Sequence, residues 1–450
     1  MITTGKKVIP WSWVILLTAT SGAAMFVETI HGSALTFTIR KFTGDPVLIS
    51  FIGGINLAFN FLVAPYVSWK SDRVWTKWGR RRPFMLVGFA MLVPSLIAVP
   101  YAPSLWILVA LIVIYQFALE LGYVGPWSPL LYSVVPIHQR GRMAVIKHIF
   151  GVLVRVFYNW VLIGQFDAVY NLNLGVGALR MTGEQVIYFT VALVIFAALL
   201  NLLFNVRELR PDNIPPPERF NLKRYLSEVF SERQFLMIYL LLFAVVALYA
   251  GLGQMLPLLI TEQFGYSKEM FGRIFVIATL VDLCVAMPIS GLIADRFDRF
   301  RTFKIGMILS TLHPLAYWGY CKFIAEGQIP SVTAIVVAQS LATLFHVVAS
   351  VCLEPYFYDL VPKNKMGTLN SGSLIVRGVM NFLVTVGVGF WVKYYTVLFP
   401  CGGKIDYLSG YLYVFLIGAC GLVVTFYFGY ERSKGRIIEY GRLEEEAAKS

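Results

Sequence analysis

Charged side chains are scarce in this sequence of 450 residues. Asp, Glu, Lys and Arg together make up 14% of the chain, and hydrophobic residues make up 58%. Water-soluble globular domains carry about 25% charged residues. A chain with so few charges cannot cover its apolar surface in water, so lipid is the expected solvent for most of it. The composition therefore excludes a soluble globule and predicts an integral membrane protein.

Several motifs that mark enzymes and metalloproteins are also missing. The five cysteines form no CxxC pair and no cluster with histidine, which indicates neither a zinc site nor a disulfide framework. No histidine begins an HxxxxD motif, and no GxxxxGK[ST] phosphate-binding loop is present. The sequence thus disfavours a membrane-embedded acyl or glycosyl transferase, excludes a primary pump, and predicts no cofactor or metal.

Apolar segments long enough to cross a hydrocarbon core of about 30 Å recur along the whole chain. They predict an all-α membrane protein with twelve spans, at 11–39, 47–69, 84–101, 104–135, 142–166, 185–206, 235–262, 269–294, 303–324, 331–361, 368–397 and 407–429.

The distribution of basic residues predicts the orientation of these spans. With the N-terminus inside, the inner segments hold 28 of the 38 Lys and Arg residues and the outer loops hold 7. Short cytoplasmic loops carry such an excess, so both termini are expected in the cytoplasm, with the protein in the plasma (inner) membrane. The same reading assigns the net charge of +13 to topology rather than to nucleic-acid binding.

The two halves of the chain repeat each other. The segment Pro129–Pro136 matches Pro355–Pro362, with Pro, Tyr, Val and Pro in register, and Ser71-Asp72-Arg73 matches Ala294-Asp295-Arg296. These offsets of 226 and 223 residues predict two six-helix bundles, at 1–206 and 235–430, with a cytoplasmic linker at 207–234 and a cytoplasmic tail at 431–450. Parallel six-helix repeats with a substrate site between them are a transporter architecture that works by alternating access.

The loop after the second predicted span carries a resemblance to a known family. The stretch Ser71-Asp-Arg-Val-Trp-Thr-Lys-Trp-Gly-Arg-Arg-Arg-Pro83 resembles the signature of the major facilitator superfamily in the form found in sucrose transporters and glycoside-pentoside-hexuronide cation symporters. Gly291-Leu-Ile-Ala-Asp-Arg296 resembles the general signature of that superfamily. The resemblance implies a major facilitator fold and a secondary transporter of sugars or glycosides.

The signature residues are candidates for a cytoplasmic gate. A carboxylate at a helix end beside basic residues can pair across the cytoplasmic face and hold it closed. We favour this role for Asp72, and we interpret most of the arginines as determinants of topology that contact anionic lipid. The candidate gating residues are Asp72, Arg73, Gly79, Arg80, Arg81, Arg82, Asp295, Arg296 and Asp359.

The second predicted span departs from the sodium-coupled members of this group. There the resemblance implies one Asp directly before the proline and another one helical turn earlier, but this chain has Ala64 before Pro65 and Asn60 one turn before Ala64. Hard cations need oxygen ligands, which Ala cannot supply. Proton coupling or uniport is therefore expected rather than sodium coupling.

Ionisable side chains inside spans cost at least about 2.5 kcal/mol each, so each one is a candidate functional residue. Equivalent positions in the two halves suggest two pairs, Glu120 with Arg155 and Glu354 with Arg377, which either exchange a proton and substrate or pin helices together. His31 shares a helical face with Glu28, and we interpret it as a hydrogen-bonded packing residue. The candidates for substrate or proton coupling are Glu28, Glu120, Arg155, Asp282, Glu354 and Arg377.

Amides and aromatic rings inside the spans are candidates for a substrate cavity. A sugar site needs ring faces beside amides or hydroxyls, whereas an unpaired arginine favours an anionic solute. The cavity candidates are Asn56, Asn60, Gln116, Tyr123, Trp127, Tyr158, Gln254 and Asn381, each of which taken singly is better explained by packing. A small-molecule substrate is predicted, with an organic anion, a drug or a lipid as alternatives to a sugar; the oligomeric state stays open.

Overall fold

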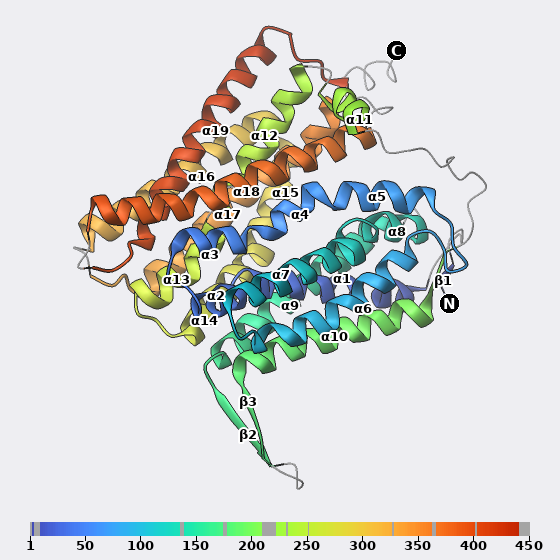
Figure 1. The fold of residues 1–450 in the computed structure, drawn as a ribbon. Coiled ribbons are helices and arrows are strands. Elements are labelled where there is room, and N and C mark those ends of the chain that lie inside the picture. The colour runs from blue at the N-terminus through green and yellow to red at the C-terminus, as the bar shows by residue number, and fades with distance from the viewer. Residues whose placement is uncertain are drawn as a thin grey trace. The chain divides into compact units, whose positions relative to one another are not determined.

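The computed structural model describes residues 2–3, 10–135, 139–173, 178–208, 222–230, 233–250, 252–325, 328–361, 366–400 and 403–440. Within these ranges the chain is almost entirely helical and divides into two compact units (Figure 1). The first unit comprises residues 1–44, 52–219 and 267–276, and the second comprises 45–51, 220–266 and 277–450. Each unit thus contains a short segment from the other half of the sequence. The predicted domain boundaries, which ignore this exchange, stay a prediction.

Within the described ranges, ten consecutive α-helices and short turns make up most of the first unit. Its α-helices are α1 (Trp11–His31), α2 (Ala34–Arg40), the end of α3 (Pro46–Gly53), α4 (Ile55–Leu62), α5 (Ala64–Arg73), α6 (Arg82–Ala98), α7 (Leu105–Leu119), α8 (Trp127–Val134), α9 (Arg140–Phe157) and α10 (Gly183–Asn205). One three-residue 3-10 turn follows α6 at Val99–Tyr101, and another lies at Ile163–Gln165, before a β-hairpin. The beginning of α14 (Lys268–Val281) also belongs to this unit.

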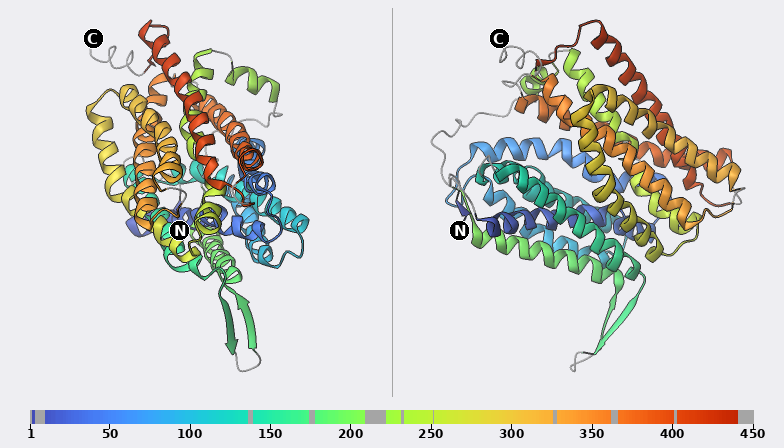
Figure 2. Two further views of the ribbon diagram at one scale, coloured as in Figure 1. Left: turned by 90° about the vertical axis from the view of Figure 1, so that its left-hand side faces the viewer. Right: turned by 180° about the vertical axis from the view of Figure 1, so that it is seen from behind.

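A β-hairpin connects the fifth and sixth predicted spans. Strand β2 (Val169–Asn173) pairs antiparallel with β3 (Ala178–Thr182), in the register Val169 to Thr182. Figures 1 and 2 show the hairpin extending beyond the ends of the helices of this unit. Helix α10 begins directly after it, because the Thr182 side chain caps the helix and Gln185 completes a reciprocal capping box. A second, parallel pair joins β1 (Ile2–Thr3) to β4 (Val206–Arg207).

The second unit contains the remaining helices. They are α11 (Leu222–Val229), α12 (Arg233–Ala250), α13 (Leu252–Leu258), the rest of α14, α15 (Met287–Arg296), α16 (Arg299–Gly319), α17 (Val332–Leu360), α18 (Met366–Leu398) and α19 (Gly410–Ser433), the last preceded by a 3-10 turn at Tyr407–Ser409. Asp298 caps α16 by accepting a hydrogen bond from the backbone N–H of Arg301 at 2.7 Å.

Among the described residues, five helices contain or end in a π-helical turn, in which one extra residue is inserted into the helix. These turns are η2 (Glu120–Val124), η4 (Tyr158–Leu162), η6 (Leu259–Gln263), η7 (Asp282–Ala286) and η8 (Tyr320–Ile324). Such turns occur often at functional sites because they turn side chains away from the regular helical positions. Glu120 and Asp282, two of the predicted intramembrane acids, each stand at the first position of one.

Eleven helical segments in the described part of the chain are long and apolar enough to cross a membrane. They coincide with eleven of the twelve predicted spans and show an integral membrane protein. The predicted span at 303–324 corresponds to α16 with its π-helical turn, which is long enough but is not among the eleven. Lys304, His313 and Pro314 lower the hydropathy of this helix. The twelfth span therefore stays a prediction.

Candidate functional site

A cluster of charged side chains lies among the helices of the first unit. Glu28 is on α1, Glu120 opens the π-helical turn after α7, and Arg155 is on α9. Glu28 interacts electrostatically with Lys147 and Arg155, and Glu120 interacts with Glu28. The structure thus connects Arg155 with Glu28, whereas the predicted pairing of Arg155 with Glu120 stays a prediction.

The two carboxylates of this cluster have different surroundings. Glu120 is 1% exposed, and its Oε2 atom accepts no hydrogen bond from the described residues. Glu28 is exposed although its neighbours Val27 and Ile30 are buried, so its carboxylate borders an accessible space. A buried carboxylate without hydrogen bonds is stabilised by binding a proton, and repulsion from a second carboxylate adds to that effect. The arrangement is suited to exchanging a proton between an enclosed and an accessible acid.

Lys147 is a member of this cluster that sequence reasoning missed. It stands eight residues before Arg155, close to two full turns of α9, so both side chains project from the same face of the helix. The sequence contained this signal, because Lys147 falls within the predicted span 142–166. The count of basic residues in the inner segments includes Lys147 instead, and so treats it as cytoplasmic.

His31 lies in a separate hydrogen-bond network of the first unit. Its Nδ1 atom lies 2.6 Å from the Tyr115 hydroxyl and 2.9 Å from the Gln116 side-chain amide nitrogen, and its Nε2 atom lies 2.7 Å from the Gly53 carbonyl oxygen. Because the amide nitrogen donates, Nδ1 accepts, and the ring proton on Nε2 is donated to Gly53. This arrangement agrees with the interpretation of His31 as a hydrogen-bonded packing residue.

Three aromatic cavity candidates are packed inside the first unit. Trp127 is 1% exposed and donates from Nε1 to the Ser21 hydroxyl at 2.7 Å. Tyr158 is fully buried, and its hydroxyl lies 2.6 Å from the Ser33 hydroxyl. Tyr123 stacks on Trp127 with ring centroids 6.2 Å apart. In this structure the Trp127 and Tyr158 rings are covered by protein, which corresponds to the packing alternative.

The polar cavity candidates divide between the two units. In the first unit, Asn56 and Asn60 are half-buried on α4, and Gln116 is bonded to His31. In the second unit, Gln254 and Asn381 are each 6% exposed on α13 and α18, two helices that contact each other. The Asn381 Oδ1 atom is buried and accepts no hydrogen bond from the described residues. It is therefore available to a ligand or to water.

Two of the three predicted coupling residues of the second unit have described side chains. Asp282 is 8% exposed at the start of η7, and Arg377 donates from Nη2 to the Ser373 hydroxyl at 3.4 Å. The Glu354 side chain lies outside the described residues, so its predicted pairing with Arg377 is untested. The side chains of Asp72, Arg73 and Asp295 also lie outside the described residues.

The signature loop is held by bonds that join the start of α6 to the end of α10. The Glu208 carboxylate accepts the backbone N–H groups of Arg81 and Arg82 at 2.9 and 3.3 Å. The Arg82 guanidinium in turn donates to the carbonyl oxygens of Leu202 and Leu203. Each helix end thus receives the charge that complements its dipole.

This contact gives Arg82 a structural role that the topology interpretation did not assign. Arg81 and Arg82 are 6% and 9% exposed, Arg80 is half-buried, and Arg296 is exposed at the end of α15. In the second unit, Asp359 accepts from Arg299 at 2.7 Å. Glu208 was not singled out from the sequence, because its position beside α6 depends on how α10 packs.

No group of three or more metal-binding side chains occurs among the described residues.

Comparison with known proteins identifies the family. The profile of the Major Facilitator Superfamily matches residues 17–385. Comparison with curated proteins found no match. Among solved structures, an auto-inhibited POT family peptide transporter aligns with a TM-score of 0.71 and 11% identity, covering 96% of this chain and 98% of that one.

Two further structures show the same fold. A POT family transporter in complex with a thioalcohol-conjugated peptide aligns with a TM-score of 0.68 and 14% identity, over 94% and 96% of the two chains. A bacterial homologue of the human lysosomal transporter Spinster, inward-facing and unoccupied, aligns with a TM-score of 0.64 and 14% identity, over 92% and 93%. Since the profile covers most of the sequence and the fold extends over nearly all of it, this chain belongs to the major facilitator superfamily of transporters.

Proposed function

We propose that this protein is a proton-coupled secondary transporter that moves a small polar solute by alternating access. The observation that carries the proposal is the cluster in the first unit, where buried Glu120 interacts with accessible Glu28, and Glu28 interacts with Lys147 and Arg155. Intramembrane acids paired with basic residues are typical of proton relays in transporters.

Coupling follows because a proton competes with the basic side chains Arg155 and Lys147 for the Glu28 carboxylate. When Glu28 is ionised, Arg155 and Lys147 stabilise it, and the repulsion on Glu120 favours a proton there. When the proton moves to Glu28, the two basic side chains become available to hydroxyl or carboxylate groups of a solute. Solute binding and proton binding are then linked through one set of side chains.

For the substrate we propose a sugar or a glycoside. The support is the signature loop Ser71–Pro83, which resembles that of sucrose transporters. The absence of carboxylates at Ala64 and Asn60 concerns the coupling ion, and it argues for protons rather than sodium. The alternatives are an organic anion, a drug or a lipid. The positive charge of Arg155 and Lys147 beside Glu28 supports an anionic or zwitterionic solute such as a short peptide as the second candidate.

The proposal includes a twelve-span topology with both termini in the cytoplasm of the plasma (inner) membrane. It rests on the concentration of Lys and Arg in the inner segments. Two bundles at 1–206 and 235–430 that move relative to each other are part of the same proposal.

The test is uptake into proteoliposomes with and without an inward proton gradient. Radiolabelled sucrose, maltose, a monosaccharide and a dipeptide are compared for the native chain, Glu120→Gln and the control Asp167→Asn, a carboxylate in the same unit whose side chain is 71% exposed. We expect gradient-driven uptake of a saccharide by the native chain and by Asp167→Asn. Glu120→Gln should retain solute exchange but lose the response to the gradient.

Distinct results overturn distinct parts of the proposal. Dipeptide uptake without saccharide uptake replaces the substrate class and leaves proton coupling intact. Native uptake that ignores the gradient overturns proton coupling, and an unchanged gradient response in Glu120→Gln removes Glu120 from the coupling path.

A further inference from the structure

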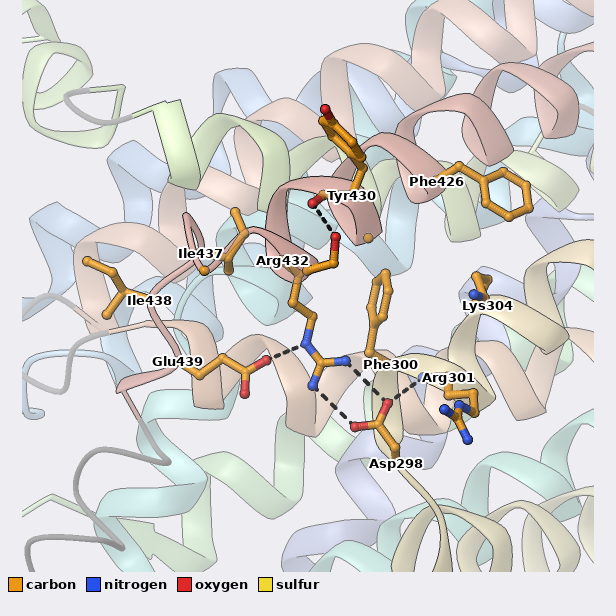
Figure 3. Close-up of a pocket in the computed structure, with 13 residues that line it drawn as sticks. Asp298, Phe300, Arg301, Lys304, Phe426, Tyr430, Arg432, Ile437, Ile438 and Glu439 are labelled. Atoms are coloured by element: carbon orange, nitrogen blue, oxygen red, sulfur yellow. Dashed lines mark hydrogen bonds and ion pairs between the residues drawn. The ribbon is translucent and has the colours of Figure 1, made fainter.

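A cavity of about 960 Å³ lies between the beginning of α16 and the end of α19 in the second unit. Its remaining wall is the segment that follows α19, including Ile437, Ile438 and Glu439. Figure 3 shows Arg432 in the middle of the lining side chains, with Glu439 on one side of it and Asp298 on the other.

One wall of the cavity is closed by a network centred on Arg432. Its guanidinium lies 3.2 Å from the Asp298 carboxylate and 2.6 Å from the Glu439 carboxylate (Figure 3). Glu439 also accepts the Tyr356 hydroxyl at 2.9 Å, and the guanidinium lies 5.2 Å from the centre of the Phe300 ring. Both carboxylates that line the cavity are thus occupied by Arg432.

Two further cations line the cavity from α16. Arg301 and Lys304 are one helical turn apart and project from the same face of the helix. In the part of the chain that the structure describes, neither side chain forms an ion pair with a carboxylate, because Asp298 accepts the backbone N–H of Arg301 and pairs with Arg432. Lys304 Nζ lies 5.9 Å from the centre of the Phe426 ring. The cavity therefore has a cationic edge.

The edge beside these cations is aromatic and lies where a span ends. Phe426 and Tyr430, one turn apart on α19, are each 51% exposed. Both fall in the last two turns of the candidate span Tyr407–Ser433, at the depth where aromatic side chains meet lipid head groups. A cationic edge beside exposed apolar faces at this depth is complementary to an amphiphile with an anionic head.

We propose that this cavity binds an anionic phospholipid. The phosphodiester head lies against Arg301 and Lys304, and the first part of an acyl chain lies along Phe426 and Tyr430. Basic pockets between spans at a membrane surface bind lipid head groups through this combination of charge and apolar contact. A soluble phosphate would use the cationic edge alone, so the aromatic edge favours the lipid. The proposal does not depend on the transported solute.

The test measures the thermal stability of the purified full-length protein in a neutral detergent during lipid titration. The probes are short-chain phosphatidylglycerol, phosphatidylcholine with the same acyl chains, and inorganic phosphate. The proteins are the native chain, R301Q/K304Q, Phe426→Ala and the control Lys404→Gln, which removes an exposed basic residue outside the cavity.

We expect phosphatidylglycerol, but neither phosphatidylcholine nor phosphate, to raise the unfolding temperature of the native protein and of Lys404→Gln. A surface cation contributes about five- to sixfold in affinity for anionic lipid, so R301Q/K304Q should bind about thirtyfold more weakly. Phe426→Ala, which keeps both cations, should also weaken phosphatidylglycerol binding.

Equal stabilisation of R301Q/K304Q and the native chain by phosphatidylglycerol would overturn the site. Stabilisation by inorganic phosphate that matches the lipid effect and is unaffected by Phe426→Ala would overturn the lipid as ligand. If R301Q/K304Q is unstable without lipid, Phe426→Ala is compared with Lys404→Gln instead. Weaker phosphatidylglycerol binding by Phe426→Ala supports the site, and equal binding by the two variants overturns it.

Discussion

Gly79 stands in the signature loop at a backbone conformation that L-residues rarely adopt. Its φ is +109°, and a Cβ atom at this position would overlap the Glu208 carboxylate that caps α6. We expect Gly79→Ala to lower stability by about 1 to 3 kcal/mol through backbone strain, with further loss from displacement of Glu208. Thermal unfolding in detergent measures the effect.

Gly265→Ala is the matched control for this substitution. Gly265 also has a positive φ, +73°, but has open space around its Cβ position. The difference between the two variants isolates the contact with Glu208. Equal unfolding temperatures would show that the contact of Glu208 with the start of α6 adds no measurable stability.

Asp45 lies just before α3 and forms an ion pair with Lys393 in the second unit, with Nζ and Oδ2 2.6 Å apart. Burial opposes its ionisation, but hydrogen bonds from Lys393 and from the backbone N–H of Val47 outweigh this and lower the pKa of Asp45 below its ordinary 3.8. A carboxylate whose pKa is lower in the folded than in the unfolded state stabilises the fold at pH values above its unfolded-state pKa. This stabilisation is lost only as the pH falls through the folded-state pKa.

Lowering of the pH to 5.5 therefore leaves the ion pair intact. We expect Asp45→Asn to cost about 0.5 kcal/mol, equally at pH 5.5 and 7.5, since both partners are partly exposed. Unfolding temperatures at the two pH values test this. A cost that changes between them would mean that another titrating group acts on the pair, and a pH response of transport in this range should come from other residues.

At the scale of the element, α16 decides the topology. It runs from Arg299 to Gly319 and continues as a π-helical turn to Ile324, which is long enough to span a membrane despite its lower hydropathy. Helix packing explains how its polar groups are tolerated, because His313 and Thr311 are buried within the second unit. We therefore expect α16 to span.

Reporter fusions on either side of α16 test this expectation. A tag accessible from one side of the membrane after Arg296 and from the other side after Gln328 would establish the twelfth span. Both tags on the same side would leave eleven spans and place the two termini on opposite sides of the membrane.

At the scale of the whole molecule, each unit is completed by residues from the other half of the sequence. The first unit includes residues 267–276, where a Cβ at Gly272 would overlap the Asn159 carbonyl oxygen. The second unit includes residues 45–51, and the backbone of this segment comes close to Gly389 of α18. A Cβ at Gly389 would lie 2.6 Å from the Pro46 carbonyl oxygen. Glycine thus permits a close backbone approach in both places.

This exchange predicts how the two halves behave when separated. Residues 1–208 and 222–450, expressed as separate chains, should copurify when produced together. Each half produced alone should be less stable, because it lacks a segment of its own unit. Affinity purification through a tag on one half, followed by thermal unfolding, measures both effects; two halves that are equally stable alone and together would contradict the expectation.

The sequence alone determined the membrane environment, eleven of the spans and the superfamily. Each of these depends on local composition or on a short contiguous motif, since twenty apolar residues span a bilayer whatever their neighbours are. The sequence also indicated Glu28, Glu120 and Arg155 as candidates, because any charge within a span is costly.

Only the tertiary structure decided which of these residues meet. Arg155 interacts with Glu28, Glu208 caps α6, and the Trp127 and Tyr158 rings face protein. These outcomes depend on helix tilt and rotation and on the extra residue of each π-helical turn, which shifts every later side chain around its helix. Hydropathy averages over the faces of a helix, and a contact between residues a hundred positions apart depends on one particular face.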